Sequence, residues 1–203
     1  RAERNANAGM VVGIDPPDFP RDPAQFEAQL GEHFGAGDLA ADAAHPLGGL
    51  VLQRQLEAGA FTLGGSDYRA PAQRVGDFLA RRASTGPGEV EPSYRPGVTW
   101  TDLHAALPGW ATDALHAALP AFGRKIKGYD MADAVMTGVE TRTSAPVNIQ
   151  RGDDFQSLNV RGLYPAGEGA GYAGGILSAG VDGLRTAEAV AVQLLGAPAN
   201  QLG

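Results

Sequence analysis

The sequence predicts an α+β fold, in which a mostly helical subdomain is joined to a few strands and one long C-terminal helix. Before residue 130, apolar residues recur at helical spacing in several segments, whereas strand-like segments rich in Val and Thr gather after it. From about Gly175 to Leu195 the apolar stripe is continuous and is opposed by Asp182, Arg185 and Gln193. That pattern is typical of a long amphipathic helix.

Composition limits the classes of function. The 203 residues are 43% hydrophobic and 19% charged, which predicts a globular protein with a core. The net charge is -7 and the arginines are scattered, so neither nucleic acid nor a membrane surface is expected as a partner. The sequence has no cysteine, which excludes disulfides, thiolate nucleophiles and Cys-based zinc sites. The four histidines show no paired metal spacing, and we expect no metal site and a cytoplasmic location.

Helix signals divide the first part of the chain. Pro23 suits a first helical turn and Gly31 a helix end, while Gly64 and Gly65 follow another periodic segment. Thr101 is expected to cap a short helix. We therefore expect a strand at residues 10–14, helices at 23–31, 46–61, 71–82, 101–107 and 110–119, and a loop at 84–97.

The C-terminal third has a different character. Strands are expected at residues 134–141, 146–149 and 162–167, with Pro165 near the end of the last one because proline has no N–H to donate. The long helix then begins near Gly175. We call residues 162–175 the glycine loop; they include the last expected strand and lead into this helix.

The glycine loop reads Gly-Leu-Tyr-Pro-Ala-Gly-Glu-Gly-Ala-Gly-Tyr-Ala-Gly-Gly and holds the candidate binding residues. A helix start offers unpaired N–H groups and favours an electron-rich ligand group, and glycines allow close approach. Glu168 would repel phosphate, so its expected partners are ligand hydroxyls. No Gly-Lys-Ser/Thr follows the glycines, so the loop is not a Walker A motif, and we do not expect it to act as a GxGxxG dinucleotide-binding fingerprint. The candidates are Gly167, Glu168, Gly169, Gly174 and Gly175; the alternative is a glycine-rich turn that only lets a helix pack closely.

Several sequence words resemble a family of bacterial FAD-dependent dehydrogenases, many of uncharacterised substrate. The glycine loop is one of them. Others are Gly-Val-Glu-Thr-Arg-Thr-Ser-Ala-Pro-Val (138–147), Lys-Gly-Tyr-Asp-Met-Ala-Asp-Ala-Val (127–135), Tyr-Arg-Ala-Pro-Ala-Gln-Arg-Val-Gly-Asp-Phe-Leu (68–79) and Arg-Asn-Ala-Asn-Ala (4–8). The resemblance spans essentially the whole chain.

The resemblance implies a Rossmann-like FAD-binding domain, in which an N-terminal GxGxxG unit binds the adenine end of FAD. It implies that Glu168 hydrogen-bonds a ribityl hydroxyl, and that N–H groups around Gly175, Ile176 and Leu177 face the pyrimidine side of the flavin. Arg142 would orient an anionic substrate or a flavin oxygen; the alternative is a surface arginine. No catalytic residue is assigned.

The chain departs from the family in lacking the N-terminal unit of a strand followed by GxGxxG, and it opens with Arg1 rather than Met. We therefore expect it to be the C-terminal portion of a longer FAD-dependent oxidoreductase, inactive by itself and without FAD. Residues 1–19 would be a strand segment of the flavin or substrate domain, 20–133 a mainly helical substrate or cap subdomain, and 134–203 the end of the FAD-binding domain. NAD(P)H or an unknown small molecule would be the substrate, and the uncovered long helix would favour self-association. The alternative function is a non-catalytic binding or interaction module.

Overall fold

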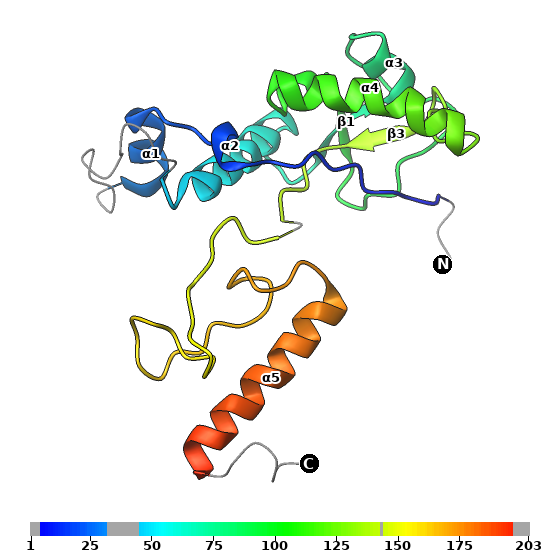
Figure 1. Cartoon of the computed structure of the whole chain (residues 1–203). Helices are drawn as coiled ribbons and strands as arrows, with labels where there is room; N and C mark the ends of the chain where they lie inside the picture. Colours follow the sequence, from blue (N-terminus) through cyan, green and yellow to red (C-terminus); the bar gives the residue numbers. More distant parts are fainter. Residues whose placement is uncertain (1–4, 32–44, 143, 197–203) are drawn as a thin grey trace. The chain divides into compact units, whose positions relative to one another are not determined.

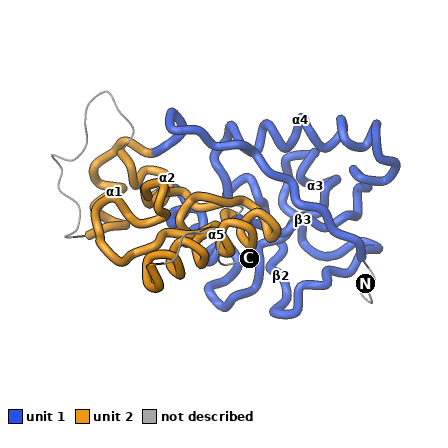
Figure 2. The backbone as a smooth tube through the Cα atoms, turned by 60° about the horizontal axis from the view of Figure 1, so that its bottom comes forward, with its two compact units in different colours: residues 1–19, 52–140 blue, residues 20–51, 141–203 orange. Residues whose placement is uncertain are grey.

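The computed structural model describes residues 5–31, 45–142 and 144–196. The chain divides into two compact units, each made of two separate stretches of sequence (Figure 2). Unit 1 comprises residues 1–19 and 52–140, and unit 2 comprises residues 20–51 and 141–203. Helices and one small sheet occur in the described residues, which confirms the predicted α+β class. No helix within the described ranges is both long and apolar enough to cross a membrane.

Two helices lie in the first part of the chain (Figure 1). Helix α1 (Pro23–Leu30) begins at a proline, and the side chain of Asp22 accepts a hydrogen bond from its second residue. Gly31 ends it at a φ of 59°, a conformation that favours glycine. Helix α2 (Gly48–Leu63) begins in unit 2 and continues into unit 1. Both helices were predicted from their spacing and end signals.

The sheet belongs to unit 1 and has the order β2-β1-β3. Its central strand β1 (Ala70–Arg74) pairs in parallel with β2 (Val98–Trp100) and antiparallel with β3 (Val135–Thr137). Pro71 lies in this central strand, where its carbonyl still accepts from the Gly138 N–H. Proline is uncommon in such a position because it cannot donate to the ladder.

The core of unit 1 forms between the sheet and the helices that follow its strands. Helix α3 (Val75–Leu79) contributes Val75 and Phe78, and α4 (Gly109–Lys125) contributes Leu115 and Leu119. The short helix η4 (Leu103–Ala105) adds Leu103. Phe78 and Leu119 are the most enclosed of these, at 1% and 2% exposure. Unit 1 therefore has an apolar centre of its own.

A polar network ties the ends of β1 and α3 to the following loop. The Asp77 carboxylate accepts from the Ser84 hydroxyl at 2.7 Å and from Arg74 Nε at 2.8 Å, and it pairs with Arg82 at 2.6 Å. Its side chain is only 2% exposed. Buried Gln73 donates to the Arg82 carbonyl. These contacts satisfy the buried polar groups of Asp77, Ser84 and Gln73.

The prediction of a helix over residues 71–82 is confirmed only for 75–79, which form α3. Residues 70–74 form β1, because pairing with two strands distant in sequence outweighs the local helical spacing. The apolar run at 10–14 forms no strand; Met10 and Val12 instead pack against the core as irregular chain. Residues 103–105 form a 3-10 turn rather than a longer helix, and its cap is Asp102, whose side chain accepts from the His104 N–H, rather than Thr101.

Helix α4 is longer than expected, since it continues through Pro120 to Lys125. Proline removes one intrahelical hydrogen bond. Burial of Leu115 and Leu119 before it and the ring contact of Phe122 with Tyr129 at 5.3 Å after it hold the helix together across this position. The tertiary contacts therefore override a local stop signal.

The C-terminal third holds less sheet than expected. Strand β3 covers only Val135–Thr137, and residues 146–149 and 162–167 form no strand. These segments are turns and irregular chain of unit 2, and an isolated antiparallel bridge lies between them in sequence, from Arg151 to Ser157. Val- and Thr-rich segments need partner strands, and the described part of unit 2 supplies none. The long helix α5 (Ile176–Leu195) was predicted and is confirmed. The expected division of the chain into residues 1–19, 20–133 and 134–203 stays a prediction.

Candidate functional site

The glycine loop lies in unit 2 and runs as a series of turns directly into α5 (Figure 1). Gly167 has a φ of 67° and Gly171 a φ of 80°, which are left-handed conformations that suit glycine. A Cβ added at Gly171 would lie 2.6 Å from the Val147 carbonyl oxygen. This glycine therefore serves close packing, as the alternative of a structural turn expects.

Backbone hydrogen bonds hold the loop closed on itself. The Gly171 N–H donates to the Glu168 carbonyl at 2.9 Å, and the Tyr172 N–H donates to the Gly167 carbonyl at 3.0 Å. The Asn148 side chain donates to the Gly171 carbonyl at 3.1 Å from outside the loop. These hydrogen bonds close the turn within unit 2.

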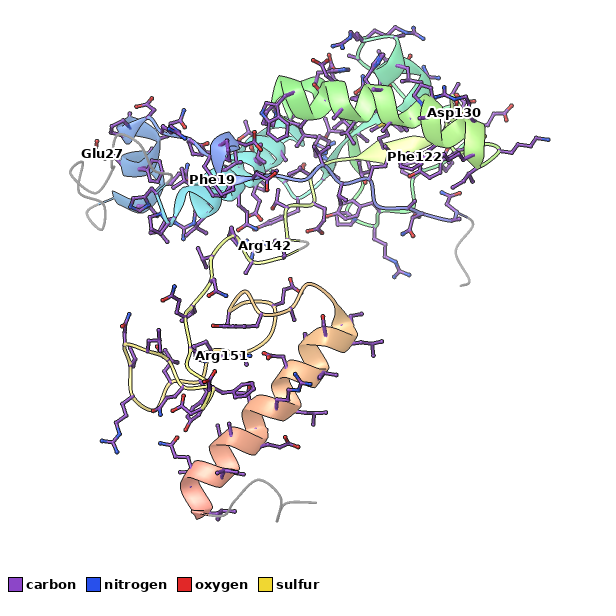
Figure 3. All side chains as sticks on the ribbon, in the orientation of Figure 1. Phe19, Glu27, Phe122, Asp130, Arg142 and Arg151 are labelled. Atoms are coloured by element: carbon purple, nitrogen blue, oxygen red, sulfur yellow. The ribbon has the colours of Figure 1, made fainter. Side chains whose placement is uncertain are left out.

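A clamp of charged and aromatic side chains connects the loop to α5 (Figure 3, where Arg151 is labelled). The Arg151 guanidinium donates to Asp182 Oδ2 at 3.0 Å and Oδ1 at 2.5 Å, and to the Pro165 carbonyl at 2.7 Å. It stands 4.4 Å from the Phe155 ring centroid and 3.7 Å from that of Tyr172. Arg151 and Asp182 are 10% and 12% exposed, so this ion pair is largely enclosed.

Asp182 also touches the loop backbone. Its Oδ2 accepts from the Gly167 N–H at 2.8 Å. The hydrogen bond from the Arg151 guanidinium lowers the pKa of the Asp182 carboxyl, and the Gly167 N–H adds to that lowering. The same pairing raises the pKa of Arg151. Both groups are therefore charged over the whole neutral range.

The first turn of α5 faces outward. Gly175 caps it in an extended conformation, with no side-chain hydrogen bond to the free N–H groups of the first turn. Ile176 and Leu177 are 94% and 85% exposed. Unpaired N–H groups at the start of a 20-residue helix carry partial positive charge and suit an electron-rich ligand edge.

Seven of the eight predicted site residues lie together on this loop and helix start. Glu168 and Gly169 are exposed, as are Gly174 and Gly175. An open hollow of about 350 Å³ lies beside them, lined by Tyr172, Leu177, Ser178, Val181, Asp182 and Arg185. Glu168 is not among its lining residues, so the hollow continues along α5 rather than across the Gly167-Glu168 turn.

Arg142, the eighth predicted residue, lies apart in sequence, in the exposed segment that follows β3 (Figure 3). Thr143, its neighbour in the predicted motif, lies outside the described residues. Asn5 belongs to unit 1, where its side chain donates to the Glu91 carbonyl at 2.6 Å. The expected role of Arg142 toward a flavin oxygen or an anionic substrate stays a prediction.

Sequence reasoning missed the clamp. Asp182 was noted only as part of the polar face of the long helix, and Arg151 and Tyr172 were not considered. A carboxylate between Val181 and Gly183, in an otherwise apolar stretch of helix, was the available signal. Its partner could not be identified because Arg151 is 31 residues away and lies in irregular chain.

Unit 1 holds a second pair of polar groups that could suggest catalysis. His104 Nδ1 lies 2.7 Å from Asp102 Oδ1, and the imidazole stacks on Phe78 at 4.4 Å. Its Nε2 is buried without a hydrogen-bond partner in the described structure. A nitrogen enclosed in this way cannot reach a substrate, so the pair contributes packing. Across the described ranges, no three His, Asp or Glu side chains gather as a metal site would require.

Comparison with known proteins places the chain. The family described as FAD-dependent protein, C-terminal domain-like, matches residues 1–143, which is more than half of the sequence. The chain belongs to this family. The match ends before the glycine loop and covers unit 1 together with residues 20–51 and 141–143 of unit 2.

A relative from Clostridium beijerinckii, named only as an uncharacterized protein, is 46% identical over 184 residues. This similarity covers 91% of the present chain, so it includes most of the sequence after residue 143 as well. The chain spans about 30% of that relative's length. The relative therefore contains a long additional sequence, and the activity of a whole protein of this kind is a matter for proposal.

Proposed function

We propose that this family member contributes the ribityl- and flavin-facing half of an FAD site in an FAD-dependent oxidoreductase of the dehydrogenase type. One observation supports this proposal above all: a left-handed turn at Gly167 is followed by the exposed Glu168 and then by the uncapped start of α5. FAD, when bound, supplies hydride or electron-pair transfer. The protein's part, in this proposal, is to bind and orient it.

The hydrogen-bonding groups of the loop and of the start of α5 fit such a ligand. A carboxylate accepts hydrogen bonds from hydroxyl groups, and the ribityl chain offers several of them. The exposed N–H groups at the start of α5 would stabilise negative charge on the pyrimidine edge as the flavin is reduced, in the manner of an oxyanion site. The adenine and pyrophosphate half would come from an N-terminal Rossmann-like unit of a strand followed by GxGxxG, which is not among these 203 residues.

Exposed apolar side chains on α5 support the same proposal. Leu177, Leu184 and Leu195 are 85%, 69% and 71% exposed in the described structure. A helix face of this kind is buried in most soluble proteins. Further sequence of an FAD-binding domain would cover it, and the length of the Clostridium relative is consistent with such a domain.

The test is Glu168→Ala in the natural polypeptide that contains residues 1–203, with Glu188→Ala on the exposed side of α5 as the matched control. Loss of a charge-assisted hydrogen bond should weaken FAD binding by roughly 1–3 kcal/mol, measured by titration of flavin fluorescence. The control should bind as the wild type does. Equal FAD affinity in both variants would contradict the role of Glu168.

A second variant tests the need for close approach. Gly175 has an extended backbone with a φ of -163°, and an added Cβ would lie 3.7 Å from the Ser178 hydroxyl oxygen. Gly175→Val should therefore fold but carry little flavin after purification. Normal flavin content would favour the alternative, in which the glycine loop is a packing turn of a non-catalytic interaction module. Gly171 favours that alternative through its contact with Val147.

The electron donor is also part of the proposal. NAD(P)H or a reduced small-molecule substrate would supply the electrons, and Arg142 would orient an anionic substrate or a flavin oxygen. Arg142→Gln should then raise the KM for such a substrate with little change in FAD content. Visible absorbance near 450 nm, a general property of oxidised flavins, would report that content.

A further inference from the structure

We propose that Arg151 and Asp182 are positioning residues, whose ion pair fixes the Gly167-Glu168 turn in the conformation that receives the ribityl chain of FAD. This inference rests on the proposed function and extends it to two residues outside the predicted site. Glu168 is exposed and would contact the ribityl chain. The side chains of Arg151 and Asp182 are largely enclosed, so we do not expect them to contact it. They act through the loop backbone.

Asp182 Oδ2 makes two hydrogen bonds at once. It accepts from Arg151 at 3.0 Å and from the Gly167 N–H at 2.8 Å. Gly167 is the left-handed residue of the turn, and Glu168 is the next residue along the chain. A movement of this carboxylate is therefore passed directly to the peptide that presents Glu168.

Arg151 fixes the carboxylate in turn. Its guanidinium is a rigid fork, and it binds both oxygens of Asp182 while also donating to the Pro165 carbonyl. The rings of Phe155 and Tyr172 lie against it. Pro165 and Tyr172 flank the Gly167-Glu168 turn in sequence, so one side chain holds both ends of the turn.

The Tyr172 hydroxyl adds a third connection. It accepts from the Arg151 backbone N–H at 3.0 Å and lies 3.2 Å from the Ile149 carbonyl, to which it donates. Segment 149–151, the glycine loop and α5 thus meet at one point. Because these contacts restrict the loop's conformation, we expect ligand binding to cost less conformational entropy.

An enclosed ion pair is poorly explained by stability alone. Replacing such a pair with apolar residues is often neutral or stabilising, because both charges must leave water. Unit 2 nevertheless encloses this pair against the loop while leaving Leu177 and Leu184 exposed on the same helix. The arrangement selects one position of the loop relative to α5.

The test uses Asp182→Asn and Arg151→Lys in the natural polypeptide that contains residues 1–203. Asparagine keeps an oxygen for the Gly167 N–H but leaves Arg151 without its counter-charge, and lysine keeps the charge but loses the fork. Glu188→Gln and Arg161→Lys, the same changes at exposed positions of unit 2, are the matched controls. Tyr172→Phe, which keeps the ring and removes only the hydroxyl, serves as a milder variant should the others fold poorly.

FAD affinity is measured by fluorescence titration, and the order of the loop by hydrogen exchange at the Gly167, Gly171 and Tyr172 amides without FAD. We expect the Kd for FAD to rise by a factor of roughly ten or more in Asp182→Asn and Arg151→Lys. Hydrogen exchange at these amides should be faster in both variants, and the controls should match the wild type. The rise in Tm that FAD induces should shrink in the variants. A merely structural pair would lower the Tm with and without FAD by equal amounts, and this result would overturn the inference.

The outcomes separate this inference from the proposed function. Wild-type protein that binds no FAD would overturn the proposed function, and with it the role of the pair in FAD binding. Wild-type affinity that survives in both variants, despite faster exchange at the loop amides, would overturn the positioning role alone. Unchanged exchange in Asp182→Asn, Arg151→Lys and Tyr172→Phe would overturn it as well.

Discussion

Different interactions stabilise the interior of each of the two units. Unit 1 has an apolar core, in which Phe78 and Leu119 are almost completely enclosed. The C-terminal part of unit 2 relies instead on the Arg151–Asp182 pair and on loop hydrogen bonds, and the helix of this part leaves Leu177 and Leu184 exposed. Unit 1 has an enclosed apolar core, whereas this part of unit 2 exposes apolar side chains of its helix.

The largest expected effect concerns the chain by itself. If an N-terminal GxGxxG unit supplies about six hydrogen bonds at a net 0.5–1.5 kcal/mol each, a half-site without it would lose about 3–9 kcal/mol of binding free energy. The 203-residue chain should therefore bind FAD roughly two to six orders of magnitude more weakly than a polypeptide that carries both halves. Isothermal titration with FAD measures this, and a Kd below about 1 µM for the chain alone would contradict it.

A smaller effect contrasts the apolar residues of the two units. Phe78→Ala should lower the free energy of unfolding by about 3–5 kcal/mol, because it leaves a cavity in an enclosed core. Leu184→Ala in α5 should change the chain's stability by less than about 0.5 kcal/mol, since this side chain is 69% exposed. Urea denaturation compares them.

Leu184→Ser provides the complementary control, because the exposed face of α5 should favour self-association. Light scattering should show less association in this variant than in the wild type. A strictly monomeric wild-type chain would contradict the prediction that the exposed face of α5 makes contacts with another chain. A cost of several kcal/mol for Leu184→Ala would do the same.

The smallest effect concerns the polar network of unit 1. The Ser84 hydroxyl, followed by Arg74, lowers the pKa of Asp77 below its ordinary value of 3.8. A lowered pKa in the folded state means that Asp77 stabilises the protein above about pH 4 and loses that contribution as the pH falls through the folded pKa. Asp77→Asn should cost up to about 3 kcal/mol at pH 7, since Arg74 and Arg82 keep partial access to water.

The measurement is the free energy of unfolding of wild-type and Asp77→Asn protein between pH 7 and low pH. The difference between the two should shrink as the pH falls, because protonation removes the charge that the substitution removes. Exposed Asp113, which pairs with Arg81, offers the control: Asp113→Asn should have little effect at any pH. A constant difference for Asp77→Asn across the range would show that its charge is not what stabilises unit 1.

Local signals were sufficient for several parts of the fold. The proline and glycine at the ends of α1 and the continuous apolar stripe of α5 act within a few residues of each other, so the sequence alone identifies these helices. The candidate binding residues from Gly167 to Leu177 are equally local, because they are consecutive along the loop and the first turn of α5. Their grouping follows from the chain itself.

Other parts depend on residues distant in sequence, and only the tertiary structure decided them. β1 carries a helical pattern and a proline, yet pairing with residues 98–100 and 135–137 makes it the central strand. Arg151 has no local signal that points to Asp182, which lies 31 residues away. Local periodicity sets which side of a helix is apolar, but strand pairing and enclosed ion pairs gain their free energy only when separate segments meet.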